Sequence, residues 1–178
     1  PHSSILDIQD KVDTEYDIQV QGPVLIQYSH RRFLAGLSED IDTPERIQQI
    51  HRIAEDEDYP GRRFTFLDNQ HGHFMFAYFD RCLLLDIAEL CQCNCTGWVI
   101  DGRGESKEYL QRSIEAYSEA IQVYFKNPDT YSSSRESFNA LKEFSQRPQK
   151  PGFFRANQTD RRRYKKMALI NGDRSKVG

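Results

Sequence analysis

The sequence has no long apolar run and few cysteines, and each of these absences excludes a class of protein. No stretch of its 178 residues approaches the run of about eighteen apolar residues that a membrane-spanning helix needs. No basic-then-apolar segment at the N-terminus resembles a signal peptide. Four cysteines are too few for a secreted disulfide scaffold. We therefore expect a soluble, cytoplasmic protein with no membrane partner.

Familiar catalytic signatures are also missing. The chain has no Gly-x-Ser-x-Gly turn, no Walker loop, no His-Glu-x-x-His motif and no glycine-rich dinucleotide fingerprint. It does contain eleven Phe and nine Tyr, an aromatic content that disordered chains lack. The length fits one domain or a large piece of one. Because the chain begins with Pro1 rather than Met, we expect that it was processed or cut from something longer.

The formal charge of −3 conceals an uneven distribution. Residues 141–178 contain eleven Lys or Arg and three Asp or Glu, whereas residues 1–140 contain thirteen basic and twenty-four acidic side chains. We expect a body over residues 1–146 and a basic tail over 147–178, broken by Pro148, Pro151 and Gly152. Such a tail favours an anionic partner, and its basic run with one aromatic could bind RNA or could simply be solvated. The run consists of Arg161, Arg162, Arg163, Tyr164, Lys165 and Lys166.

Hydrophobic spacing and turn residues predict helices interspersed with strands. The expected helices cover residues 3–11, 43–54, 82–91, 106–126 and 135–144. The expected strands cover residues 18–21, 24–28, 64–67, 73–76 and 98–100, with a hairpin across 64–76. The succession of strand and helix through residues 98–126 favours parallel βα units and an α/β fold. A complete (β/α)8 barrel needs about 250 residues, so the chain could hold only part of one.

Two segments that follow expected strands carry candidate site residues. Asp101, Arg103 and Ser106 lie between the strand at 98–100 and the next helix, where ligands of α/β folds bind. An Arg at this position can hold a carboxylate with two parallel hydrogen bonds, although an Asp–Arg pair can also be structural. The second segment follows the strand at 24–28, and it is either part of the same site or a solvated loop. Its candidates are Ser29, Arg31 and Arg32.

The cysteines form a conspicuous group without the spacing of a metal site. Cys91, Cys93 and Cys95 are separated by single residues, whereas structural zinc sites have two to four residues between paired ligands. Cys82 lies further upstream. We therefore expect these residues to be free thiols, with no metal bound.

From residue 17 to about residue 157 the order of motifs resembles the collagenase-like peptidase family U32. No motif is specific alone, but their shared order is. They are Gln19-Val20-Gln21-Gly22, Tyr28-Ser29-His30-Arg31, the hairpin, Asp80-Arg81-Cys82-Leu83-Leu84, Ile100-Asp101-Gly102-Arg103 with Ser106, Glu115-Ala116-Tyr117-Ser118-Glu119-Ala120 and Gly152-Phe153-Phe154.

The resemblance implies the C-terminal portion of a TIM-like (β/α) barrel with an inserted β-hairpin, incomplete in this chain. It also implies prephenate-dependent hydroxylation of the wobble uridine of tRNA, the activity of the branch that the chain looks closest to. Other branches hydroxylate ribosomal RNA or act in ubiquinone synthesis, and several carry an iron–sulfur cluster bound by four cysteines. Because only Cys82 matches a cluster position, we expect no cofactor.

Three functions remain open at this point. The first is tRNA modification, with Asp101 and Arg103 near a small acidic, prephenate-like substrate and the tail near tRNA. The second is a peptidase, the activity for which the family was named, although no His partner for Cys82 is evident. The third is a non-catalytic subunit that completes a complex with a related chain or with a second copy. We favour the first, and we leave open whether the chain is an enzyme.

Overall fold

The computed structural model describes residues 1–34 and 49–155, and it is a mixed α/β structure built on one six-stranded sheet. The strand order is β2-β3-β4-β1-β5, and β6 pairs with β4. In chain order the elements are α1 (His2–Gln9), β1 (Asp17–Ser29), β2 (Ile50–Glu55), β3 (Arg63–Asn69), β4 (Gly72–Cys82), α2 (Ile87–Leu90), β5 (Gly97–Ile100), α3 (Lys107–Lys126), α4 (Arg135–Glu143) and β6 (Gln149–Lys150).

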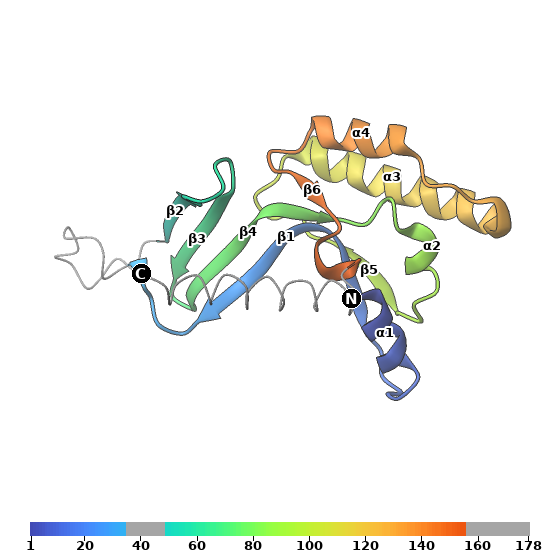
Figure 1. The fold of residues 1–178 in the computed structure, drawn as a ribbon, viewed down its shortest axis with the longest axis horizontal. Helices are drawn as coiled ribbons and strands as arrows, with labels where there is room; N and C mark the ends of the chain where they lie inside the picture. The colour runs from blue at the N-terminus through green and yellow to red at the C-terminus, as the bar shows by residue number, and fades with distance from the viewer. Residues whose placement is uncertain (35–48, 156–178) are drawn as a thin grey trace, which may run out of the picture.

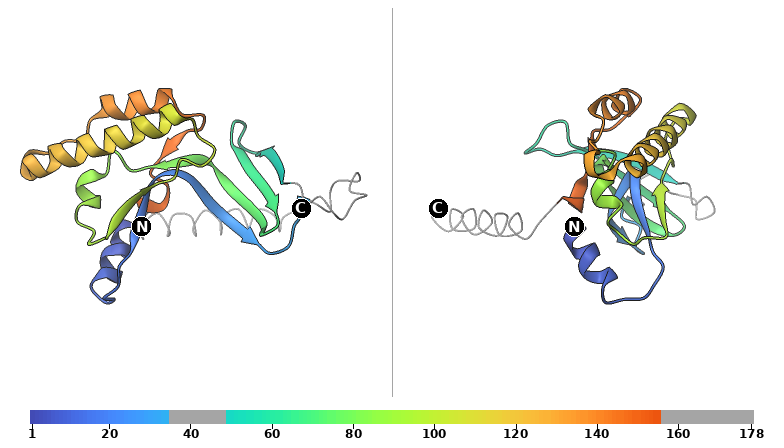
Figure 2. Two further views of the ribbon diagram at one scale, coloured as in Figure 1. Left: turned by 180° about the vertical axis from the view of Figure 1, so that it is seen from behind. Right: turned by 90° about the vertical axis from the view of Figure 1, so that its right-hand side faces the viewer.

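The two longest strands, β1 and β4, connect two ends of the molecule (Figure 1). They pair with each other at both ends. One end lies beside β2 and β3, and the other lies among β5, β6 and the helices. Figure 2 shows α3 and α4 lying side by side at this helical end. The candidate site residues after β5 therefore lie at the helical end.

The hydrophobic core lies between α3 and the adjoining ends of β1 and β4. Val20, Leu83 and Leu84 are buried there together with Tyr109 and Tyr117. The two tyrosines are eight residues apart in α3, so helical periodicity places them on one face. The Tyr117 hydroxyl donates to the Val20 carbonyl at 2.8 Å and accepts from the Leu83 N–H at 2.8 Å. It thereby links α3 to both long strands.

The local signals around the hairpin and α3 were interpreted correctly. Strands β3 and β4 form the expected antiparallel hairpin. Strand β5 pairs in parallel with β1, and α3 follows it in the expected βα order. Ser106 caps α3, because its hydroxyl accepts from the Tyr109 N–H at 3.1 Å. Helices α1 and α4 also form where they were expected.

Two expected helices were wrong in the region that the structure describes. Ile50–Glu55 is strand β2, paired with β3 in unbroken antiparallel register, while residues 43–48 of that expected helix lie outside the described residues. The four-residue spacing of Ile50 and Ala54 is compatible with one face of a strand as well as with one face of a helix. Pairing with the edge of β3 selects the strand. In the second case β4 continues through Cys82, and only Ile87–Leu90 is helical.

The sheet is more antiparallel than the sequence predicts. Among the described strands, only the pairs β1–β5 and β4–β6 are parallel. The segments expected as two strands before and after Pro23 form one strand, with a register shift between Pro23 and Leu25. None of the helices in the described part of the chain has the length and apolar composition that a membrane crossing requires.

Candidate functional site

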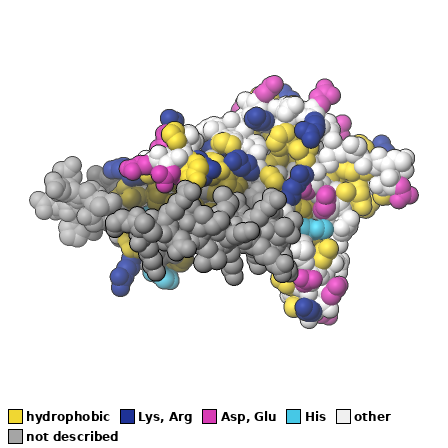
Figure 3. Space-filling model, in the orientation of Figure 1, with side chains coloured by type: hydrophobic (Ala, Val, Ile, Leu, Met, Phe, Trp, Pro, Cys, Tyr) yellow, Lys and Arg dark blue, Asp and Glu magenta, His cyan; other side chains and the backbone are white. Residues whose placement is uncertain are grey.

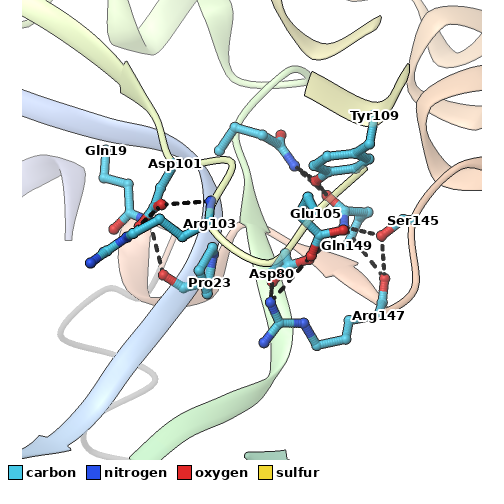
Figure 4. Close-up of polar contacts among 11 residues, drawn as sticks. Gln19, Pro23, Asp80, Asp101, Arg103, Glu105, Tyr109, Ser145, Arg147 and Gln149 are labelled. Carbon is cyan, nitrogen blue, oxygen red and sulfur yellow. Dashed lines mark hydrogen bonds and ion pairs between the residues drawn. The ribbon is translucent and has the colours of Figure 1, made fainter. Parts of the chain in front are cut away.

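Asp101 and Arg103 form a two-pronged ion pair immediately after β5 (Figure 4). Arg103 Nε donates to Asp101 Oδ1 at 2.9 Å, and Arg103 Nη2 donates to Oδ2 at 2.6 Å. The Arg103 side chain is 83% exposed, whereas that of Asp101 is 11% exposed. The guanidinium therefore remains accessible from solvent while one of its edges is held by the carboxylate.

The backbone of β1 closely supports this pair. The Asp101 N–H donates to the Gln21 carbonyl at 2.9 Å, so the β1–β5 ladder continues into the loop. Gly22 has a φ of +113°, and a Cβ on it would lie 2.2 Å from the Asp101 carbonyl oxygen. Only glycine tolerates both this backbone conformation and this approach. The Gly22-Pro23 sequence, interpreted as a break between strands, thus lets the chain pass close to Asp101.

A buried group of one arginine and two carboxylates lies close to this pair. Arg147 Nη2 lies 2.8 Å from Asp80 Oδ1 and 3.4 Å from Glu105 Oε1. Both carboxylate side chains are buried, and Arg147 is largely buried. Glu105 Oε2 is also buried and has no hydrogen-bond partner among the described residues. One guanidinium thus pairs with two carboxyl groups. Its single positive charge cannot compensate two buried negative charges.

Amide and phenol groups extend this group into the core. Gln149 donates from Nε2 to Asp80 Oδ2 at 3.4 Å and accepts at Oε1 from Gln21 Nε2 at 2.6 Å. Gln21 Nε2 also hydrogen-bonds the Tyr109 hydroxyl. In Figure 4, Asp80, Glu105, Tyr109, Arg147 and Gln149 point toward one another from β4, the loop after β5, α3 and the segment around β6. Four separate parts of the chain therefore meet at this position.

Burial and neighbouring charges shift the pKa values in opposite directions. Burial raises the pKa of Asp80 to about 6, partly offset by Arg147 and increased by Glu105. Hydrogen bonds from Arg103 lower the pKa of Asp101, which burial alone would raise. Burial also raises the pKa of the Tyr109 phenol. Asp80 is therefore the group here that can change protonation near neutral pH, while Asp101 stays ionised.

The structure does not bring the second predicted segment to this site. Ser29 lies eight residues beyond Gln21 along β1, roughly 26 Å away at the usual rise of a strand. There it pairs with His73 of β4, and its hydroxyl accepts from the Arg31 N–H at 3.1 Å. Arg31 and Arg32 follow Ser29 at the end of the molecule that carries β2 and β3.

The remaining predicted residues have different positions. Ser106 is at the site, but its hydroxyl is occupied in capping α3. The basic run at residues 161–166 lies outside the described residues. Part of the predicted tail joins the body, because Arg147 contacts Asp80, β6 pairs with β4 and Phe154 is buried.

The described residues contain no evident metal centre. No three His, Cys, Asp or Glu side chains in residues 1–34 and 49–155 are grouped so that they could hold a metal ion. All four cysteines are free thiols. Burial raises the pKa of Cys82 and of Cys93 to about 11. The expectation that no cofactor is bound stays a prediction.

The sequence analysis did not identify the buried group. Asp80 and Gln21 were noticed only as parts of motifs, Arg147 was assigned to the tail, and Tyr109 and Gln149 were not singled out. The available signal was a single acid, Asp80, following the apolar and aromatic residues 74–79. A charged residue in such a run is rarely buried without a partner.

Comparisons with known proteins connect this architecture to a family. The model of peptidase family U32 matches residues 1–164. The tRNA hydroxylation protein P2 of Bacillus subtilis (strain 168) is 25% identical to the chain over 143 residues, which are 76% of the chain and 45% of that protein. The chain thus spans less than half the length of this curated relative. No solved structure matches the chain.

Proposed function

The chain belongs to peptidase family U32, and on that premise we propose that it acts in prephenate-dependent hydroxylation of the wobble uridine of tRNA. The observation that carries this proposal is the similarity to a relative named as a tRNA hydroxylation protein. Because the chain spans 45% of that relative, the activity proposed is that of a whole assembly to which this chain contributes.

In this proposal Arg103 binds the acidic substrate. Its guanidinium is exposed, and Nη1 has no hydrogen bond to the described residues, so it can donate to a substrate carboxylate while Asp101 fixes the side chain. Arg147 is already engaged by Asp80 and Glu105, and it holds the strand end together rather than binding the substrate directly. Protonation of Asp80 would leave the positive charge of Arg147 less compensated, and this charge would then attract an anionic ligand more strongly.

We further propose that the parallel pair β1–β5, with α3 after it, is part of a TIM-like barrel that other strands complete. Strand β5 is an outer strand of the sheet, and Val99 on it is 42% exposed. An outer parallel strand of this kind presents unpaired backbone groups and needs a neighbour or a cover. A second, related chain or a second copy of this chain would supply that neighbour and complete the substrate site beside Asp101 and Arg103.

Hydrolysis of peptides has less support from the described residues. A cysteine nucleophile needs a lowered pKa and a basic partner. The Cys82 thiol is buried, burial raises its pKa to about 11, and its neighbour is the Tyr117 hydroxyl at 4.0 Å. Cys82 therefore belongs to the core.

The proposal is tested by the nucleoside profile of bulk tRNA. Mass spectrometry would compare tRNA from cells with the gene, cells without it, and cells without it that carry a plasmid copy. We expect the hydroxylated wobble uridine to disappear on deletion and to return with the plasmid. An unchanged profile after deletion would remove the proposed function.

A further inference from the structure

A bulge in β4 lies in a gap between two neighbouring strands. Strand β1 pairs along one edge of β4, while the other edge pairs with β3 as far as Phe76 and with β6 from Asp80 onward. On the β1 side, Pro23 lies opposite Asp80 but Leu25 lies opposite Phe76. Residues 77–79 of β4 are thus opposite a single residue of β1. Bulges of this kind redirect side chains and often occur beside functional sites.

The bulge brings consecutive aromatic side chains together. In a regular strand Tyr78 and Phe79 would point to opposite faces. Here their ring centroids are 5.2 Å apart at an interplanar angle of 81°. Phe64 of β3 adds an edge-on contact to Tyr78 at 5.6 Å. The result is a continuous aromatic surface between β3 and β6.

Two cations lie close to these rings. The guanidinium carbon of Arg62 is 3.9 Å from the centroid of the Tyr59 ring and 5.2 Å from that of Tyr78. Lys150 Nζ is 4.6 Å from the Tyr78 centroid and donates to the Tyr78 hydroxyl at 2.8 Å. We call this set the cation–aromatic ladder, and it consists of Tyr59, Arg62, Tyr78, Phe79 and Lys150.

The ladder is partly accessible, with Tyr59 exposed and its other members half-buried, and its cations are not paired with carboxylates of the described residues. Among the described residues, neither Arg62 nor Lys150 forms an ion pair, whereas Arg63, Arg103, Arg147 and Arg155 each do. Tyr59 is 54% exposed. Figure 3 shows dark-blue and yellow surfaces side by side over the region where β3, β4 and β6 meet. Cations retained over aromatic rings, without carboxylates, are suited to a ligand that is both flat and anionic.

We propose that the cation–aromatic ladder binds single-stranded RNA. An unpaired base stacks on the exposed Tyr59 ring, and the adjoining phosphates lie near Arg62 and Lys150. The acidic residues 56–58 next to Tyr59 repel phosphates, so the RNA backbone runs toward Lys150. This inference rests on the proposed function, because an anticodon loop presents unpaired bases of this kind.

The test measures the affinity of the full chain for a fluorescent anticodon stem–loop and for a duplex of equal length. The ladder variants are Arg62→Gln, Lys150→Gln and their combination, together with Tyr78→Phe, which retains the ring. The matched control is Arg112→Gln on α3, because the guanidinium carbon of Arg112 lies 4.7 Å from the centroid of the Phe144 ring, which is outside the ladder. Thermal unfolding of every variant shows that the fold is retained.

We expect the double variant to bind the stem–loop about tenfold more weakly or worse, with a slope of log affinity against log salt that is shallower by about two. Tyr78→Phe and Arg112→Gln should bind as the unaltered protein does, and the duplex should bind less tightly than the stem–loop. Equal affinity of the double variant and the control would overturn the inference, as would a failure of the unaltered chain to bind RNA. A change in self-association with unaltered RNA binding would assign the ladder to a protein contact and would equally contradict it.

The outcomes separate this inference from the proposed function. If deletion of the gene abolishes the hydroxylated uridine but the ladder variants bind RNA normally, only the inference fails. If deletion leaves tRNA unchanged but stem–loop binding depends on the ladder, the proposed function fails and the inference that the ladder binds RNA stands.

Discussion

Replacing Asp80 by Asn tests the electrostatics of the buried site through the pH dependence of stability. Burial raises the pKa of Asp80 from 3.8 to about 6. The folded protein therefore binds this proton more tightly than the unfolded chain does. The stabilising contribution is present in full below about pH 4 and is lost as the pH rises through about 6. Asn has nearly the shape of the protonated acid but does not titrate, so Asp80→Asn removes this dependence.

The expected magnitude follows from the size of the pKa shift. A difference of about two pKa units corresponds to roughly 3 kcal/mol between the two protonation states. The free energy of unfolding of the unaltered protein, relative to Asp80→Asn, should thus fall by about that amount between about pH 4 and about pH 7. Carboxylates with lowered pKa values, such as Asp101, act in the opposite direction but contribute to both proteins.

Urea denaturation of the full chain at a series of pH values measures this difference. Glu57→Gln is the matched control, because it neutralises an exposed carboxylate on the β2–β3 connection. Its difference from the unaltered protein should vary little with pH. A flat difference for Asp80→Asn over the same range would refute the reasoning, since it would mean that Arg147 keeps Asp80 ionised throughout.

Two further predictions concern the contacts that position the site. Gly22→Ala should lower the free energy of unfolding by more than about 2 kcal/mol, because a Cβ would lie 2.2 Å from the Asp101 carbonyl oxygen; Gly61→Ala has a similarly positive φ but open space, so it should cost clearly less in the same urea titration. Tyr117→Phe removes the hydroxyl that links Val20 and Leu83, and should cost about 1–2 kcal/mol. An unchanged denaturation midpoint in either variant would contradict the corresponding contact.

The elements that were predicted correctly have their signals in neighbouring residues. Ser106 precedes an apolar stripe with helical spacing, and Asn127-Pro128 follows that stripe. Both ends of α3 can therefore be identified from neighbouring residues. The β3–β4 hairpin has turn residues between two aromatic runs. Strand β2 lacks such a local signal, because its conformation is decided by pairing with β3.

The buried site could not be predicted for a related reason. Asp80 and Arg147 are far apart in the sequence and meet only because β6 adds to the edge of β4. The segment around Arg147 contains prolines and is basic, which is also typical of a solvated tail. Asp101 and Arg103 were identified because strand, loop and helix follow one another there without interruption.

The central claim is that Arg103 binds the substrate and does not only stabilise the fold. The level of tRNA hydroxylation in cells tests this claim directly. Cells lacking the gene would carry the unaltered gene, Arg103→Lys, or Arg63→Lys at matched protein levels. Arg63 is the control because it pairs with Glu55 at 3.2 Å on the surface of the hairpin. Lysine keeps the charge but loses the two-pronged geometry. We expect Arg103→Lys to lower the hydroxylated wobble uridine severalfold, while Arg63→Lys leaves it unchanged. Full modification by Arg103→Lys, together with a lower melting temperature, would contradict the account.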